Sequence, residues 1–289
     1  MTQSIGNTLF GSKGINVDVL RLDLLHPQVS GNKWFKLKYY LEAAKQQGKN
    51  AMVSFGGAYS NHLVAMASVC AENGMRSTGI IRGEENMSNH SIEDMKRFGM
   101  HLIHVTREQY KNKEEYISKY LVDHHDDYYI AEGGAGFLGV EGTADIMKLI
   151  SPDYTHVICA VGTGTTLSGL INGSPFHQQI MGVNCVKFRT ENNSVSACVQ
   201  QYAKKQNYSF ISGYEFGGFG KKNDELIAFM NKLSDEEKIP TDFVYTGKLF
   251  FAVYDMISKN EFIPGSKCLL IHSGGLQGNR SLPIGLLHF

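Results

Sequence analysis

The sequence predicts an α/β protein with mostly parallel sheets, and three features support that class. Short apolar segments alternate with segments of helical periodicity along most of the chain. They follow one another at the spacing of strand–helix–strand units. Several of the apolar segments end in glycine-rich turns that lead into a helix. The length of 289 residues suits one large domain or two smaller ones.

A helix is the first element that the pattern predicts clearly. It begins near Ser30 or Asn32, either of which can cap it, and continues through "KWFKLKYYLEAA". Trp34, Leu37 and Leu41 recur at helical spacing, so we expect them to form its apolar face.

Alternating strands and helices are predicted after this first helix. The strands are expected at 50–55, 77–83, 101–105, 155–161, 180–186 and 267–273. The helices are expected at 60–75, 91–100, 165–173 and 247–260. The segment from Phe188 to Asp224 follows no clean period, and we expect loops and a helix there, near a site entrance.

Composition excludes several classes of protein. The 28 basic and 28 acidic residues give no net charge, which argues against a nucleic-acid partner or a membrane surface. The N-terminus lacks the order of a signal peptide, and no apolar run is long enough to span a bilayer. The five cysteines include no CxxC pair, so we expect reduced thiols, no metal site and a cytoplasmic protein.

Lys33 occupies an unusual place for a lysine. It falls in the first turn of the predicted helix, where the partial positive charge of the free N–H groups disfavours an ammonium. Trp34 and Phe35 would desolvate it further, and both effects lower a lysine pKa. Such a lysine is a nucleophile that forms Schiff bases with carbonyl compounds. The alternative is a surface lysine whose ammonium lies in water.

The first glycine-rich turn, "SFGGAYSNH" (54–62), connects a strand to a helix. Its two glycines let the backbone approach a ligand, while Ser60 and Asn61 can cap the helix and bind an anion. His62 follows as a candidate acid–base group. A tight turn with ordinary capping explains the same residues, and a lone histidine can be purely structural.

The second turn, "AVGTGTTLSG" (160–169), is a candidate phosphate site. Consecutive N–H groups and threonine hydroxyls at a helix start suit a phosphate dianion. The Gly-Lys-Ser/Thr ending of a P-loop and the third glycine of a dinucleotide fingerprint are both missing, so a monophosphate fits better. A structural turn is the alternative. The candidate residues are Gly162, Thr163, Gly164, Thr165 and Thr166.

The third turn, "LLIHSGGLQGN" (269–279), again ends a strand in two glycines and presents Ser273. Shortly upstream, "VYTGK" (244–248) brings Tyr245 and Thr246 to the start of a predicted helix. A capped helix and a plain turn explain these two stretches equally well.

One cofactor accounts for all of these features. Pyridoxal phosphate needs a lysine for its aldehyde, a site for its phosphate and a neutral hydroxyl facing its ring nitrogen. The sequence offers Lys33, the turn at 162–166, and the hydroxyls of Thr246 and Ser273 for these three roles.

The motifs also resemble those of a known family. "SGNKWFKLKYYL", "SFGGAYSNH", "AVGTGTT", "VYTGK" and "HSGG" occur in the order found in the D-cysteine desulfhydrase and 1-aminocyclopropane-1-carboxylate (ACC) deaminase family. These are pyridoxal-phosphate enzymes of the tryptophan synthase β-like fold (fold type II). The resemblance extends from about Gly31 to Gly275.

The resemblance implies roles for individual residues. Lys33 would form the Schiff base and act as the base at the substrate Cα, and Tyr245 would be the active-site tyrosine. Ser60 would hold the substrate carboxylate, with His62 beside it, and Asn61 would lie at the ring hydroxyl. Gly162 to Thr166 would form the phosphate cup.

The resemblance also implies two three-layer α/β/α domains and a homodimer. The larger, cofactor-binding domain would comprise residues 1–40 and 146–289, and the smaller inserted domain residues 41–145. The partners would be a small amino-acid substrate and a second copy of the chain, with no nucleic acid and no membrane.

Two positions point to the substrate. ACC deaminases have "VYEGK" and "HLGG", whereas desulfhydrases have small hydroxyl residues at both variable places, as Thr246 and Ser273 are here. A carboxylate beside the pyridine nitrogen favours a protonated ring, which is a stronger electron sink. A more neutral ring can still expel thiolate but suits the opening of a cyclopropane poorly. We therefore expect a lyase acting on D-cysteine.

Two alternatives stay open on the sequence. One keeps the cofactor but makes the enzyme an ACC deaminase. The substrate stays open because Trp34, Phe35, Phe219 and Phe243 depart from the family pattern and make the pocket more apolar. The other, of a different class, is a non-catalytic protein that binds phosphorylated metabolites or amino acids, in which Lys33 is structural. A dehydrogenase is disfavoured because no acidic residue follows a proper glycine fingerprint.

Overall fold

The computed structural model describes residues 1–83, 88–187 and 194–289, and these residues form two compact units. The first unit comprises Met1–Leu25, Ser30–Asn32 and Thr143–Phe289, and the second His26–Val29 and Lys33–Gly142. The sequence predicts 41–145 for the smaller domain, and that division stays a prediction. The second unit also contains residues 33–40.

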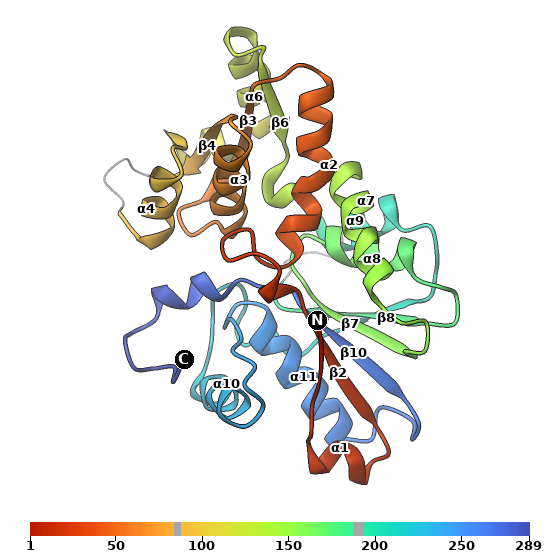
Figure 1. Cartoon of the computed structure of the whole chain (residues 1–289). Coiled ribbons are helices and arrows are strands. Elements are labelled where there is room, and N and C mark those ends of the chain that lie inside the picture. Colours follow the sequence, from red (N-terminus) through yellow and green to blue (C-terminus); the bar gives the residue numbers. More distant parts are fainter. Residues whose placement is uncertain (84–87, 188–193) are drawn as a thin grey trace. The chain divides into compact units, whose positions relative to one another are not determined.

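The first unit is built on a six-stranded sheet with the order β1-β2-β10-β7-β8-β9 (Figure 1). Only β1 is antiparallel to its neighbour; the remaining strands are parallel. The strands are β1 (Thr2–Ser4), β2 (Asn16–Arg21), β7 (His156–Val161), β8 (Gln179–Asn184), β9 (Tyr208–Ile211) and β10 (Lys267–His272).

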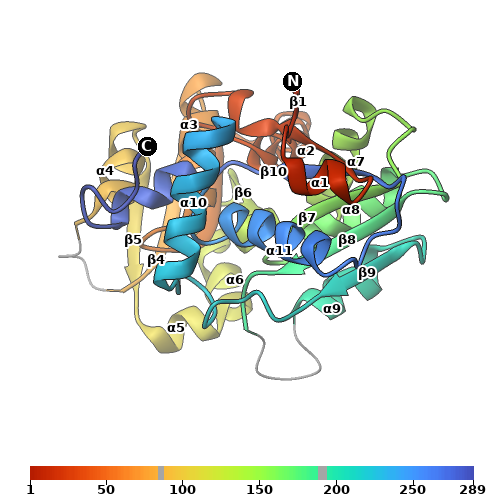
Figure 2. The ribbon, with the colours of Figure 1, turned by 90° about the horizontal axis from the view of Figure 1, so that it is seen from below.

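Helices cover both faces of this sheet, as Figure 2 shows from below. Helix α11 (Thr246–Ser258) packs on one face with α1 (Thr8–Ser12) and α10 (Asp224–Glu237) beside it. Helix α8 (Thr165–Gly173) packs against β7 and β8, with α9 (Ser194–Tyr202) next to it. Short 3-10 helices complete the unit at Leu22–Leu24, Asp145–Leu149 and Leu276–Ser281.

The second unit has a four-stranded, wholly parallel sheet with the order β5-β4-β3-β6. Its strands are β3 (Ala51–Gly57), β4 (Arg76–Arg82), β5 (His101–Val105) and β6 (Asp127–Ile130). Its helices are α2 (Asn32–Gln46), α3 (Asn61–Glu72), α4 (His90–Arg97), α5 (Arg107–Lys111), α6 (Lys113–Asp123) and α7 (Phe137–Ala144), with a 3-10 turn at Glu132–Gly134.

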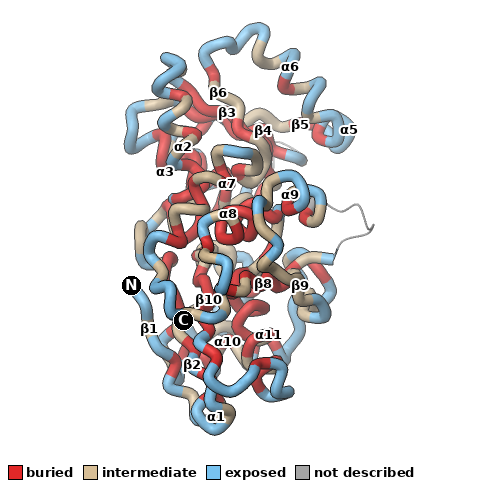
Figure 3. Tube along the Cα trace, turned by 90° about the vertical axis from the view of Figure 1, so that its right-hand side faces the viewer, coloured by how far each residue is buried: buried red, intermediate tan, exposed pale blue. Residues whose placement is uncertain are grey.

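Side chains alternate across the strands of the second unit and so fill two cores. Met52 and Ile81 face α2, α3 and α4, whereas Val53, Phe55 and Ile80 face α5 and α6. Because both faces are covered, the interior strand β3 is buried along residues 51–56, as is usual in parallel sheets. Figure 3 shows the buried residues gathered on the strands and on the helix faces that pack against them.

The predicted class, α/β with mostly parallel sheets, is confirmed. All six predicted strands are present. The prediction for Phe188–Asp224 is partly wrong, because Tyr208–Ile211 forms the edge strand β9 between α9 and α10. All four of its residues are half-buried, so no alternation marks it as a strand. Residues 188–193 of that segment lie outside the described residues.

Candidate functional site

In the first unit, Gly31 brings the chain before α2 into direct contact with the third glycine-rich turn. Gly31 has a φ of +69°, and a Cβ placed there would lie 1.8 Å from the carbonyl oxygen of Ser273. Gly274 also lies close to Ser30, since a Cβ placed on Gly274 would lie 2.3 Å from Ser30 Oγ. Only glycine allows such an approach, which explains both the Ser-Gly-Asn and the Ser-Gly-Gly stretches.

Asn32 connects this contact to the second turn. Its side-chain Nδ2 donates to Thr166 Oγ1 at 2.9 Å, and both residues are buried. Its backbone N–H donates to the Ser273 carbonyl at 3.3 Å. The residue that precedes Lys33 in the sequence is therefore bonded to the predicted phosphate cup. Sequence reasoning considered Asn32 only as a cap and missed this bond.

The predicted cup forms the start of helix α8. Gly164 is its N-cap with a φ of +86°, and the hydroxyls of Thr163 and Thr165 lie 3.1 Å apart. The first N–H groups of a helix have no partner within it, so they can donate to an anion. Gly162 lies against the ring of Tyr245: a Cβ there would approach the ring carbon Cε1 to 3.0 Å. The structure thus brings the cup and Tyr245 together within this unit.

Thr246 is fully buried, and its hydroxyl is bonded to Asp242. The Thr246 Oγ1 donates to Asp242 Oδ1 at 2.7 Å and accepts from the Asp242 N–H at 2.7 Å. The Asp242 carboxylate also accepts from the N–H groups of Val244, Tyr245 and Thr246, each at 2.9 Å. Asp242, which sequence reasoning missed, therefore caps α11. An aspartate shortly before a helix start is the signal that could have found it.

Ser273 differs from Thr246 in its hydrogen bonding. It is half-buried, and within 1–83, 88–187 and 194–289 no side chain or backbone group bonds to its hydroxyl. The neighbouring His272 is fully buried between Pro240 O (2.7 Å) and the Gly274 N–H (3.3 Å). Burial lowers the pKa of His272, while the buried carboxylate of Asp23, 3.3 Å from its Nδ1, opposes that shift.

The second unit holds the other group of predicted residues, around the start of α3. Ser60 is the N-cap and accepts from the Leu63 N–H at 3.2 Å. The Oδ1 atom of Asn61 is buried and accepts no hydrogen bond from any described residue. A buried amide oxygen without a donor is costly, so this atom is suited to a group that brings its own donor.

His62 is buried behind these two residues. Its Nε2 lies 3.0 Å from Ser54 Oγ, and its Nδ1 has no partner among the described residues. Burial, and then the charges of Lys33 and Lys36, lower the pKa of His62 from 6.5 to about 3. The ring is therefore neutral at physiological pH, and the interaction places Lys33 and His62 in one electrostatic neighbourhood.

The surroundings of Lys33 differ in part from the prediction. Lys33 is half-buried at the second position of α2, and its role stays a prediction. Phe35 is buried as expected, but Trp34 is 43% exposed and stacks on His26 with ring centroids 5.5 Å apart. The predicted apolar face was wrong at Trp34, because Leu37, Tyr40 and Ala44 form the buried stripe.

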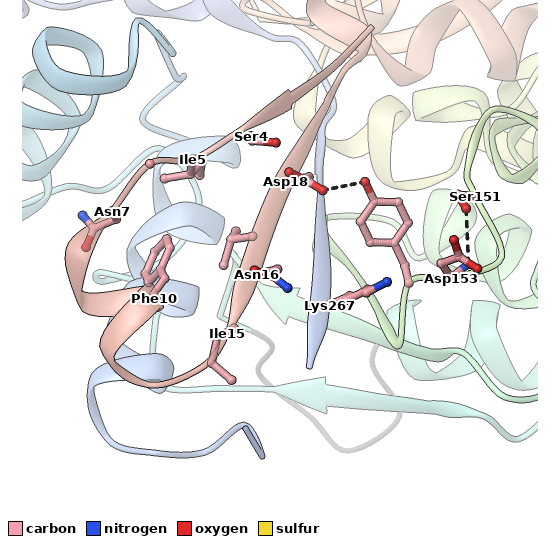
Figure 4. A pocket seen from close by; sticks show the side chains of 14 residues that line it. Ser4, Ile5, Asn7, Phe10, Ile15, Asn16, Asp18, Ser151, Asp153 and Lys267 are labelled. Carbon is pink, nitrogen blue, oxygen red and sulfur yellow. Dashed lines mark hydrogen bonds between the residues drawn. The ribbon is translucent and has the colours of Figure 1, made fainter. Parts of the chain in front are cut away.

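One cavity of the first unit lies away from the predicted site residues. It has a volume of about 440 Å³ and is lined by residues near Phe10, Asp18, Tyr154 and Lys267, as Figure 4 shows. None of the predicted site residues lines it. Over the part of the chain that the structure describes, no group of His, Cys, Asp or Glu is arranged to hold a metal ion. None of the described helices has the length and apolar character needed to cross a membrane.

Gly31→Ala should be much more damaging than Gly48→Ala. Both glycines have nearly the same left-handed φ, +69° and +66°, but nothing lies within 4 Å of a Cβ at Gly48. Gly48→Ala should therefore lower the free energy of unfolding by only about 1 kcal/mol, the cost of placing alanine at a left-handed φ. Gly31→Ala must also push Ser273 away, so we expect a loss of about 3 kcal/mol or more in urea unfolding. Equal losses of unfolding free energy in the two variants would show that the contact between Gly31 and Ser273 does not stabilise the protein.

His62 should make the protein less stable in acid. The unfolded chain binds a proton at this histidine below about pH 6.5, whereas the folded state does so only near the lowered pKa of about 3. Stability therefore rises with pH across that window, and acidification from about pH 6.5 to 5 should remove about 2 kcal/mol. In His62→Gln, the free energy of unfolding measured in urea should no longer fall in this way between about pH 6.5 and 5. In His125→Gln, a change on an exposed loop, it should fall as in the wild type. A slope that His62→Gln leaves unchanged would contradict the neutral ring.

Comparison with known proteins identifies the family of this chain. The sequence profile described as "Pyridoxal-phosphate dependent enzyme" matches residues 7–274. A Thermotoga maritima protein, named provisionally as a 1-aminocyclopropane-1-carboxylate deaminase, is 28% identical over 285 residues, covering 92% of this chain and 90% of its own length. The D-cysteine desulfhydrase of Klebsiella pneumoniae is 23% identical, covering 91% and 87%.

Solved structures agree with the sequence relatives. A crystal structure described as an ACC deaminase homologue superposes with a TM-score of 0.81 at 26% identity, covering 96% of this chain and 90% of that one. A hydrogen sulfide-producing enzyme from Fusobacterium nucleatum has a TM-score of 0.69 at 16% identity, covering 96% and 94%, and so shows the fold alone.

Proposed function

Because the chain belongs to the family of pyridoxal-phosphate dependent enzymes, we propose that it is a deaminating lyase that converts D-cysteine to pyruvate, sulfide and ammonia. The enzyme class, the cofactor and the resemblance to ACC deaminases and D-cysteine desulfhydrases are established by the family and its relatives. The substrate, the roles of individual residues, a homodimer and a cytoplasmic location are proposals.

The described residues fit the cofactor. The Oδ1 atom of Asn61, which no described residue bonds, can accept a hydrogen bond from the ring hydroxyl of the cofactor. The N–H groups at the glycine-rich start of α8 can donate hydrogen bonds to the cofactor's phosphate. When bound, pyridoxal phosphate supplies a ring that withdraws electrons from the substrate Cα. Lys33 Nζ would hold its aldehyde carbon, and the residues Gly162, Thr163, Gly164, Thr165 and Thr166 would hold its phosphate.

The chain's own groups would then handle the substrate. Ser60, with the N–H groups of α3, would bind the carboxylate, where the helix dipole favours negative charge. Lys33 Nζ would remove the Cα proton once the substrate amine has displaced it. His62, neutral and buried, would add no charge at this point. Tyr245, against Gly162, would donate or accept a proton near the leaving group.

The observation that carries the choice of D-cysteine is the absence of a carboxylate side chain at positions 246 and 273. Thr246 is fully buried and its hydroxyl donates its one hydrogen bond to Asp242 Oδ1, so it cannot also donate to the ring nitrogen. Ser273, whose hydroxyl is not used by any residue described, is the better candidate for that role. A neutral hydroxyl there keeps the ring less protonated, which suffices for a good leaving group such as thiolate.

ACC deamination is a second candidate, because the Thermotoga maritima relative at 28% identity carries that name while the desulfhydrase of Klebsiella pneumoniae is 23% identical. Measuring 2-oxo acid release from D-cysteine, L-cysteine and ACC separates the candidates. We expect pyruvate and sulfide from D-cysteine and no 2-oxobutyrate from ACC. Release of 2-oxobutyrate at a comparable kcat/KM would overturn the proposal in favour of the second candidate.

A further inference from the structure

Lys248 is a charged residue that the proposed chemistry does not use. It lies in the first turn of α11, its side chain is fully buried, and it is among the largest buried side chains of the chain. Its ammonium donates to three backbone carbonyl oxygens: Cys185 O at 2.9 Å, Glu215 O at 2.8 Å and Gly218 O at 2.8 Å. These three oxygens, here called the carbonyl cage, match the three N–H donors of an ammonium.

Burying the Lys248 ammonium costs free energy unless the carbonyl cage compensates for the lost hydration. A buried ammonium loses its hydration, and the start of a helix adds an unfavourable positive potential. Burial accordingly lowers the pKa of Lys248, while Asp242 and Glu215 oppose that shift from a distance. No carboxylate of the described chain forms an ion pair with Lys248, so the carbonyl dipoles are its direct ligands.

The cage joins segments that are distant in sequence. Cys185 follows strand β8, whereas Glu215 and Gly218 belong to the loop between β9 and α10. That loop is irregular: Phe216 has a φ of +48° and Gly218 a φ of +117°. Phe216 packs edge-on against Phe251 of α11, with ring centroids 5.0 Å apart. Without the cation, three inward-pointing carbonyls would repel one another and leave the loop without its main anchor.

The anchored loop reaches the candidate site through one aromatic ring. Phe219 directly follows the last cage residue and is 66% exposed. Its ring meets that of Tyr245 edge-on, with centroids 6.3 Å apart. The ring of Tyr245 also lies close to Gly162 at the start of the phosphate cup. The loop therefore contacts, through Phe219, a ring that also lies against the cup.

We propose that Lys248 is a positioning residue: its ammonium is an internal cation whose carbonyl cage holds Phe219 against Tyr245. The same cage is a monovalent-cation site, closed to solutes here because the lysine fills it. Its effect on turnover rests on the role of Tyr245 in the proposed function. The cage itself does not depend on that function.

Removing the side chain should make the protein dependent on a cation. In Lys248→Ala, K⁺ or NH₄⁺ at about 0.2 M should raise the Tm of the cofactor-free protein by about 2–4 °C over the same concentration of tetramethylammonium, which is too large to enter. Wild type should show no such difference. Lys205→Ala is the matched control: Lys205 also binds backbone carbonyls, of Asn172 and Ser174, but it is only half-buried. It should gain nothing specific from K⁺, because only two carbonyls bind Lys205 and they do not enclose it.

The positioning role has its own readouts. In Lys248→Ala, kcat for whichever amino acid wild type converts should fall about tenfold with KM within about twofold, and K⁺ should restore kcat. Phe219→Ala, on an exposed ring, should lower kcat in the same way without changing Tm. Phe176→Ala, the control on another exposed ring of this unit, should change neither.

The results test the cation site and the positioning role separately. A Tm gain specific to K⁺ or NH₄⁺ supports the cage even if D-cysteine is not the substrate, so failure of the proposed function is recognised separately. Equal Tm values in K⁺ and tetramethylammonium overturn it. If Lys248→Ala folds only in K⁺, this result supports the carbonyl cage as a cation site. If Lys248→Ala folds in neither salt, the proposed cation site is overturned. Normal kinetics in Phe219→Ala overturn the positioning role.

Discussion

Lys33→Ala should lower turnover by about 10³-fold or more, which is the largest effect expected of any substitution in this chain. The amine of Lys33 would both carry the cofactor and move the proton at the substrate Cα, so its loss removes two functions together. The yellow colour of the bound cofactor should change as well, because the covalent bond to the protein is lost. Steady-state 2-oxo acid release and the absorption spectrum measure both effects.

Lys38→Ala is the matched control for this result. Lys38 lies on the same helix, five residues further on, and is exposed. We expect turnover and spectrum close to those of wild type. If Lys33→Ala retained the activity of Lys38→Ala, another lysine would carry the cofactor and the assignment of the candidate site would be wrong.

Asp242→Ala should cause the largest loss of stability. The carboxylate of Asp242 is fully buried and accepts four hydrogen bonds, three from backbone N–H groups and one from Thr246 Oγ1. Removing it leaves these donors buried without a partner, and we expect a loss of about 3–5 kcal/mol in urea unfolding of the cofactor-free protein. Turnover should fall too, because Tyr245 begins the helix that Asp242 caps.

Asp224→Ala provides the comparison for this loss. Asp224 lies in the first turn of α10 but is exposed, so its favourable interaction with the helix dipole is worth no more than about 1 kcal/mol. Similar losses in the two variants would mean that the Asp242 carboxylate does not organise the start of α11.

Much of the fold could be predicted because most strands are buried on both faces. Strands β3, β7, β8 and β10 are short apolar runs followed by turn residues, and local sequence is enough to identify them. The strands β1, β2, β6 and β9 were not predicted. Strand β1 is only three residues long and mostly exposed, and it exists because it pairs with β2 in antiparallel register. Such a strand is stabilised by its neighbour rather than by its own residues.

The candidate site could be predicted residue by residue where glycine or capping residues carry the signal. The turns at 54–62 and 160–169 and the hydroxyl of Ser60 are visible in this way. Contacts over long sequence separations are not: the bond from Asn32 to Thr166 joins residues 134 positions apart. The same limit hid the carbonyl cage of Lys248, whose ligands are backbone atoms that no side-chain pattern reveals.

Trp34 shows how helical spacing can mislead. Residues 34, 37 and 41 share one side of a helix, but so do 37, 40 and 44, and only packing decides between overlapping stripes. In α2 the second stripe is buried, and Trp34 lies at its edge against His26. The expectation that Trp34 desolvates Lys33 therefore fails, whereas Phe35 is buried as expected.

The central claim is that Lys33 carries the cofactor, and reduction with borohydride followed by peptide mapping tests it most directly. Reduction fixes pyridoxal phosphate to its lysine as a stable secondary amine, and trypsin does not cleave after a modified lysine. We predict the label in a peptide of residues 22–36, in which cleavage after Lys33 is missed. A label on any other lysine, or a peptide ending at Lys33 in fully yellow protein, would contradict the claim.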